Sequence, residues 1–156
     1  MKSPQLIIHE TVLSNLKKEK KIEFNLGQPI SGWIPVYFES EDFILEFTSS
    51  KIPENPTDRL CEALILIANG VESEMCWTEE PIRYFFKFMP ADNTYSFIID
   101  QTDKHGQNQT EIFRKNGGFE DLIMQIYRGL KKWTTVEFET SDWKMIEKDR
   151  LEKPSS

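Results

Sequence analysis

The strongest constraint on the fold is a series of short segments in which apolar and polar residues alternate with a period of two. Such alternation is typical of strands that bury one face in a core and expose the other. The clearest example is a pair of runs on either side of the turn 90–93, with apolar residues at Tyr84, Phe86 and Phe88 and then at Tyr95, Phe97 and Ile99. These runs predict antiparallel neighbours in a sheet.

The same reasoning predicts strands at several other places. A hairpin is expected from the runs 33–38 and 43–47, which are joined by an acidic turn at 39–42. Further strands are predicted at 74–78, 82–89, 94–100 and 110–115, and residues 22–26 are a candidate first strand in a stretch, 1–26, that is otherwise unassigned. Because Pro35 has no N–H for a ladder, its strand is expected at a sheet edge, or Pro35 is expected at the start of its strand.

Two amphipathic helices are predicted beside the strands. Asn55 and Pro56 form a good helix start and Asn69-Gly70 a good stop, so the first helix is expected at 56–68. Apolar residues recur at helical spacing from 119 to 132, which predicts the second.

Less regular signals occupy the C-terminal part of the chain. Val136 and Phe138 suggest a short last strand, Ser141-Asp142 a cap for a brief helix through Ile146, and 149–156 a frayed polar tail. The 156 residues suit a single domain of the α+β class. We expect an antiparallel, strongly twisted sheet of about six strands with the two helices packed on it.

Charge is unevenly distributed along the chain. The formal net charge is −7, and the segment 39–100 holds thirteen acidic and four basic residues, a net charge of −9. An acidic surface repels nucleic acid and anionic lipid, and it attracts basic macromolecules. The sequence therefore favours a protein partner over nucleic acid or a membrane surface, although acidic charge that serves only solubility remains an alternative.

The residues offer little for catalysis or metal binding. The only histidines, His9 and His105, have no obvious partner, and Cys61 and Cys76 lie in apolar patterns where cysteine is usually a buried hydrophobe. No spacing of Cys or His suits zinc, and no glycine-rich phosphate loop is present. We therefore predict no catalytic residue, no metal and no cofactor.

Compartment is inferred from what the sequence lacks. Its longest aliphatic run has six residues, no export signal is visible, and two cysteines are too few for a disulfide scaffold. We expect a cytoplasmic protein with reduced thiols.

Aromatic side chains in this chain, which is rich in acidic residues, are candidate anchors for a basic partner, since large amphipathic rings dominate many interfaces. The rings considered are Trp33, Tyr37, Trp77, Tyr95 and Trp143. The most concentrated example is the segment 77–81, where a tryptophan is close to two carboxylates. The predicted partner-binding residues are Glu39, Glu41, Asp42, Trp77, Glu79 and Glu80.

Several short motifs also resemble a known group of proteins. The block 32–36, the strand 43–47, the segment 52–56 leading into a Leu-rich helix, and Trp77-x-x-Glu80-Pro81 resemble small acidic bacterial proteins grouped with immunity proteins of polymorphic toxin systems, including the WapI type. This resemblance implies a cytosolic protein that binds and blocks a cognate toxin domain without catalysis.

Neutralisation of a basic toxin domain by binding is thus the leading hypothesis. A second hypothesis is a small enzyme or ligand-binding domain that uses a sheet pocket lined by Tyr84, Phe86 or Trp77, with Glu80 as its polar group. A third is a subunit of a larger assembly. The sequence leaves the oligomeric state open.

Overall fold

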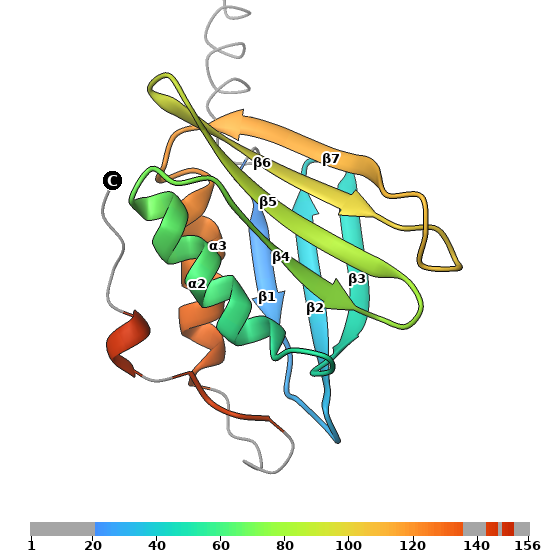
Figure 1. Cartoon of the computed structure of the whole chain (residues 1–156). Helices are drawn as coiled ribbons and strands as arrows, with labels where there is room; N and C mark the ends of the chain where they lie inside the picture. Colours follow the sequence, from blue (N-terminus) through green and yellow to red (C-terminus); the bar gives the residue numbers. More distant parts are fainter. Residues whose placement is uncertain (1–20, 136–142, 147, 152–156) are drawn as a thin grey trace, which may run out of the picture.

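The computed structural model describes residues 21–135, 143–146 and 148–151. Seven strands form one antiparallel sheet, in which each strand pairs with the next along the chain (Figure 1). The strands are β1 (Glu23–Leu26), β2 (Trp33–Ser40), β3 (Phe43–Ser50), β4 (Ser73–Thr78), β5 (Arg83–Ala91), β6 (Thr94–Gln101) and β7 (Thr110–Gly117). The helices are α2 (Pro56–Ala68), α3 (Ile123–Trp133) and the short 3₁₀ helix η1 (Lys148–Leu151).

The predicted α+β class, antiparallel sheet and two packed helices are confirmed. The expected number of about six strands is one too low, because the candidate first strand forms β1 and pairs along its whole length with β2. The expected strand at Val136 and Phe138 lies outside the described residues.

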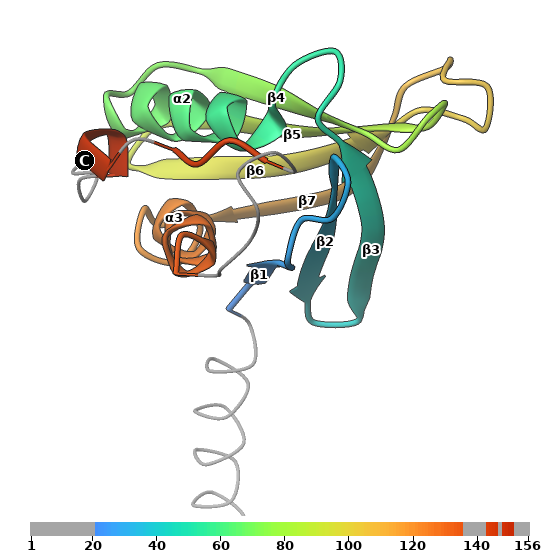
Figure 2. The same ribbon diagram turned by 90° about the horizontal axis from the view of Figure 1, so that it is seen from below.

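The sheet is sharply bent between β3 and β4. These two strands pair only at Ser50 and Thr78, whereas their other neighbours pair along most of their length. As Figure 2 shows, β1–β3 turn away from the layer formed by β4–β7. We call β1–β3 the first half of the sheet and β4–β7 the second half.

Aromatic packing joins the inner faces of the two halves. The ring of Phe38 on β2 lies 6.3 Å from that of Phe86, 5.4 Å from Phe97 and 5.0 Å from Phe113, measured between centroids. Phe24 on β1 likewise lies 5.8 Å from Phe86. Edge-to-face pairs of this kind stabilise a core beyond the area that they bury. The halves are thus held together mainly by side chains and hardly by backbone pairing.

Both helices pack against the concave side of this arrangement. The helix α2 lies beside β4 and α3 beside β1 (Figure 1), and the two helices contact each other. The side chain of Asn55 accepts the N–H of Thr57, so the predicted cap and the bounds of α2 are confirmed. α3 approaches β1 at Gly129, where an added Cβ would lie 2.2 Å from the carbonyl oxygen of Phe24.

The C-terminal segments differ from expectation. The cap expected at Ser141-Asp142 lies outside the described residues. Residues 143–146 have no regular structure, and Trp143 is buried there, where its Nε1 donates to Oγ1 of Thr57 at 2.9 Å. The tail expected to fray from residue 149 begins within η1, where Leu151 is buried and its carbonyl oxygen accepts the hydroxyl of Tyr127. The helix expected from 119 begins at Ile123, after a turn.

Pro35 lies in an inner strand and not at a sheet edge. It is the third residue of β2, and it faces the point where β1 ends, since Leu26 pairs with Val36. Its carbonyl oxygen still accepts the N–H of Gly27 at 2.9 Å. The missing N–H removes no pairing from the β1 ladder, because β1 ends at Leu26. Both expected locations, an edge strand and the start of the strand, were therefore wrong.

Candidate protein-binding face

The outer face of the first half follows directly from the alternation of its strands. Residues that point inward on β1–β3 are buried or half-buried, while their neighbours in sequence face outward. The register places Tyr37 between Asn25 on β1 and Glu46 on β3, with Glu39 beside Glu23 and Ile44. The three strands contain no Lys or Arg.

Four carboxylates lie on or beside this outer surface, which we call the acidic face: Glu23, Glu39, Glu46 and Glu79. Their hydrogen-bond donors are neutral. Glu23 accepts from the amide of Asn25 at 3.3 Å, and Glu79 accepts from the backbone N–H of Thr48 at 3.5 Å. Among the described residues none of the four forms an ion pair, so their negative charge is uncompensated.

The negative charge of the acidic face affects the pKa of Tyr37. Its hydroxyl donates to Oε1 of Glu39, and this hydrogen bond, with burial and the nearby charges of Glu39, Glu23 and Glu46, raises the pKa of Tyr37 to about 12. Negative charges disfavour ionisation of a neighbouring phenol. The same potential would stabilise a cationic group brought to this surface.

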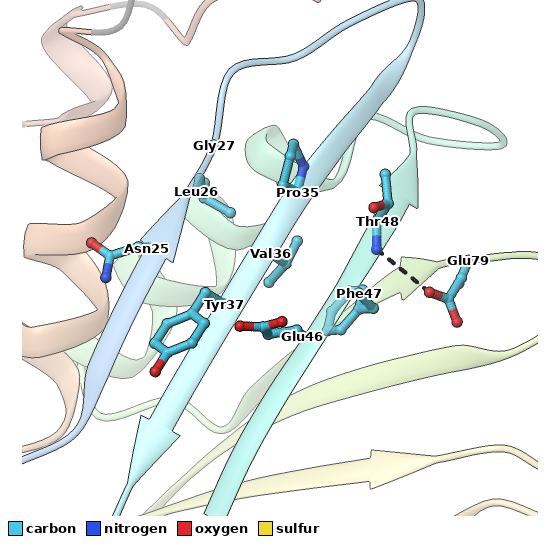
Figure 3. A pocket seen from close by; sticks show the side chains of 10 residues that line it. All are labelled: Asn25, Leu26, Gly27, Pro35, Val36, Tyr37, Glu46, Phe47, Thr48 and Glu79. Atoms are coloured by element: carbon cyan, nitrogen blue, oxygen red, sulfur yellow. Dashed lines mark hydrogen bonds between the residues drawn. The ribbon is translucent and has the colours of Figure 1, made fainter.

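A shallow hollow of about 500 Å³ crosses the acidic face (Figure 3). Its floor is β2 around Pro35 and Tyr37, and Glu46 and Thr48 line the side formed by β3. Glu79, which follows β4, closes one end. The hollow offers aromatic and aliphatic surface with carboxylates at its border, which suits the long alkyl chain and charged head of Lys or Arg.

Apolar side chains are exposed at one end of the face. Trp33 begins β2 and is 37% exposed, while Ile30 in the preceding loop and Ile52 after β3 are 65% and 64% exposed. Backbone hydrogen bonds hold these segments together, between Ile30 and Trp33 and from Lys51 to Gly32. Aromatic rings beside charged residues are frequent binding hot spots.

The structure brings only part of the predicted partner-binding set to this face. Glu39 and Glu79 belong to it. Glu41 and Asp42 lie in the β2–β3 turn, where Glu41 pairs with Lys115 at 3.6 Å, and Glu80 is exposed in the turn after β4.

The prediction that Trp77 binds a partner is wrong. Its side chain is 0% exposed, because alternation along β4 turns it into the core against Phe24, Phe47 and Phe86. A partner on the surface therefore cannot contact this ring. Trp33, which the sequence also offered as an aromatic anchor, is the exposed tryptophan of the acidic face.

The rings proposed for a ligand pocket are also part of the core. Trp77 and Phe86 are fully buried, and Tyr84 stacks on Phe47 with centroids 4.0 Å apart. The hydroxyl of Tyr84 donates to Glu79 at 3.4 Å and not to Glu80. These contacts leave the three rings filling space between the halves of the sheet.

Sequence reasoning missed Glu23 and Glu46. Both occupy polar positions of alternating strands, so the pattern assigned them to a solvent face. What it lacked was the register that places Glu23 opposite Glu39, and Glu46 opposite Tyr37. Cross-strand pairing is set by tertiary structure and turn geometry, which one sequence does not display.

Comparisons with protein-family models, with curated protein sequences and with solved structures found no match for this chain. Within the described residues, neither helix is long and apolar enough to span a membrane.

Proposed function

We propose that this chain is a cytoplasmic, non-enzymatic binding protein of the immunity type, which neutralises a cognate toxin domain by covering a basic surface of that domain. The acidic face is the proposed interface, and the proposal agrees with the motifs that resemble WapI-type immunity proteins.

The observation that carries the proposal is the uncompensated charge of the acidic face. Glu23, Glu39, Glu46 and Glu79 meet no cation among the described residues, and the first three lie near the half-buried Tyr37 and help to raise its pKa. Like charges brought together in a fold destabilise it unless a partner compensates them. A basic partner supplies that compensation, and its approach is accelerated by the same field.

In this proposal, the carboxylates increase the rate of association with the partner, while apolar side chains contribute to the affinity of the complex. Carboxylates steer a basic domain toward the face, an effect that salt weakens because the Debye length falls to about 8 Å at physiological ionic strength. Trp33 and the exposed isoleucines at the end of the face supply apolar contact that salt does not screen. We therefore expect association to slow with added salt while dissociation changes less.

The test begins with capture of the partner. The tagged protein is exposed at low salt to lysate and secreted fractions of its source organism, and retained proteins are identified by mass spectrometry. The purified partner is then titrated with the wild type and with the triple variant Glu39→Lys, Glu46→Lys and Glu79→Lys. We expect a toxin domain, and an affinity that falls by about 100-fold or more in the variant.

A matched control carries the same change in charge elsewhere. Glu72, Glu74 and Asp92 are exposed and lie outside the acidic face, so their replacement by Lys should change affinity by less than about threefold. Equal losses in both triple variants would indicate a general charge effect. No loss in the acidic-face variant, or a retained protein without toxic activity, would contradict the proposal.

A further inference from the structure

The edge of β3 that faces away from β2 is largely open. β3 pairs with β2 from Phe43 to Ser50, but with β4 only at Ser50. No other described strand forms backbone pairs with it. Open strand edges are templates for pairing with an additional strand from another chain.

The direction of the backbone groups on this edge can be assigned. Thr48 is opposite Pro35, whose carbonyl oxygen points toward β1, and the N–H of Thr48 donates away from β2, to Glu79. Alternate residues of a strand direct their N–H and C=O groups to the same edge. Since the β2–β3 register has no interruption, Ile44 and Glu46 present their backbone groups to the open edge as Thr48 does.

The side chains along the open edge of β3 determine which kind of added strand would be complementary to it. Ile44, Glu46 and Thr48 are exposed on the acidic face, and the intervening residues point toward the core. A strand added here would extend the acidic face by one strand. Its outward side chains would lie next to Glu46 and close to Glu79, which ends the hollow (Figure 3).

We propose that an extended segment of the partner with Lys or Arg at alternating positions pairs with the open edge of β3 as an added strand. The inference rests on the proposed function, because it specifies how a basic partner would engage the acidic face. Main-chain hydrogen bonds to Ile44 and Glu46 hold the segment, and cationic side chains compensate Glu46 and Glu79. Opposite charges on neighbouring strands stabilise pairing, whereas like charges destabilise it.

Charge also argues against a second copy of this chain as the occupant. Two copies joined through β3 would bring the Glu46 and Glu79 side chains of both into one continuous sheet without a compensating cation. Charged residues along an edge are a common means of preventing pairing between identical chains.

The first test uses the synthetic peptide acetyl-Thr-Lys-Val-Lys-Val-Lys-Thr-amide with the full chain, followed by amide hydrogen exchange in NMR spectra. The control is the same sequence with alternate backbone amides N-methylated, in two versions that block either edge. We expect the parent peptide to slow exchange at Ile44 and Glu46 by at least about tenfold, and one N-methylated version to lose this protection.

Every outcome decides the inference. Equal protection by all three peptides would mean that charge alone holds them, and no protection at millimolar peptide would mean that the edge accepts no strand; either result overturns the inference. Protection of Ile44 and Glu46 that increases with protein concentration in the absence of peptide would assign the edge to a second copy, and would also overturn it.

A pair of variants distinguishes the contribution of the backbone N–H of Ile44 to peptide binding from that of its side chain. Ile44→Pro removes the outward N–H without changing charge, and Ile44→Ala removes most of the side chain but keeps the N–H. We expect peptide binding to weaken at least tenfold in the first and less than threefold in the second. Thermal unfolding checks that the proline variant folds, and the N-methylated peptides test the same point if it does not.

These results are independent of the test of the proposed function. If N-methylation has no effect but the acidic-face triple variant loses its captured toxin, the added strand is wrong and the acidic interface stands. If the triple variant keeps full affinity, the proposed function is wrong whatever the peptides do.

Discussion

The outer faces of the two halves of the sheet differ in whether their charged side chains form ion pairs. On the second half, Nζ of Lys87 lies 3.1 Å from Oδ2 of Asp100, and Arg114 lies 2.9 Å from Glu111. The guanidinium of Arg83 also lies over the ring of Phe85, 5.6 Å from its centroid. On the acidic face of the first half, the carboxylates have only neutral donors. One antiparallel sheet therefore combines a face that contains internal ion pairs with a face that is complementary to an external cation.

The two halves also differ in what holds them in place. The strands of the second half pair along most of their length, with one irregularity between β6 and β7, while the first half joins it through one backbone residue pair and a group of aromatic rings. Contacts with α3 hold its other side. Substitutions at these contacts should therefore affect the first half selectively.

The largest effect is expected at Phe38, the ring that contacts both halves. Phe38→Ala should lower the free energy of unfolding by about 3–5 kcal/mol, because it removes a fully buried aromatic side chain and leaves a cavity. Urea unfolding measures the change. Phe85→Ala on the outer face of β5 is the control, with an expected loss of about 1 kcal/mol or less. Similar losses in both variants would mean that aromatic packing does not join the halves.

A smaller loss is expected at the contact between α3 and β1. Gly129→Ala places a methyl group against the backbone of Phe24 and should cost about 1–3 kcal/mol. Amide exchange should accelerate in β1 more than in β5 and β6. Gly118→Ala, where an added Cβ has no atom within 4 Å, is the control and should change stability by about 0.5 kcal/mol or less. Equal acceleration in all strands would contradict a selective role for α3.

The paired and unpaired faces should respond with opposite sign to loss of one carboxylate. Asp100 is buried and accepts from Lys87 and from Gln109, so Asp100→Asn should lower stability by about 1–2 kcal/mol. Glu46→Gln removes a charge that has no cationic partner among the described residues, and should leave stability unchanged or raise it by about 0.5 kcal/mol. Thermal unfolding of both variants at low salt measures the difference. A loss in the Gln variant would show that Glu46 is compensated within the fold.

The smallest effect concerns the titration of Tyr37, whose pKa of about 12 lies above the ordinary value of 10.0. The protonated phenol therefore favours the folded state fully below pH 10, and this contribution is lost as the pH rises toward 12. NMR titration of the assigned ring should show the pKa falling toward 10 in Glu39→Ala, which removes the largest cause of the shift. In Glu46→Ala it should fall less. Equal shifts would mean that the hydrogen bond to Glu39 does not dominate.

Local sequence signals predicted the elements well. Asn55 and Pro56 begin α2 as expected, and the alternating runs became strands with ends within a few residues of the prediction. These signals work because capping and alternation act over a few residues. They failed at the C-terminal segments, since the burial of Trp143 depends on Thr57, which is 86 residues away in the chain.

The candidate site was predicted only in part. The sequence indicated an acidic surface with aromatic anchors and named Glu39 and Glu79, which the structure places on the acidic face. It selected Trp77 as an anchor because that ring is next to carboxylates in the chain, yet along a strand neighbouring residues point to opposite faces. The ring consequently faces the core while Glu79 reaches the surface.

The sequence by itself determined the α+β class, the helix bounds of α2 and the negative charge of residues 39–100, because each depends on residue type and short spacing. Tertiary structure decided where that charge gathers. The bend between β3 and β4 opens one edge of β3, and the register brings Glu23, Glu39 and Glu46 onto one face. Register and bending arise from packing between residues far apart in the chain, so no local pattern encodes them.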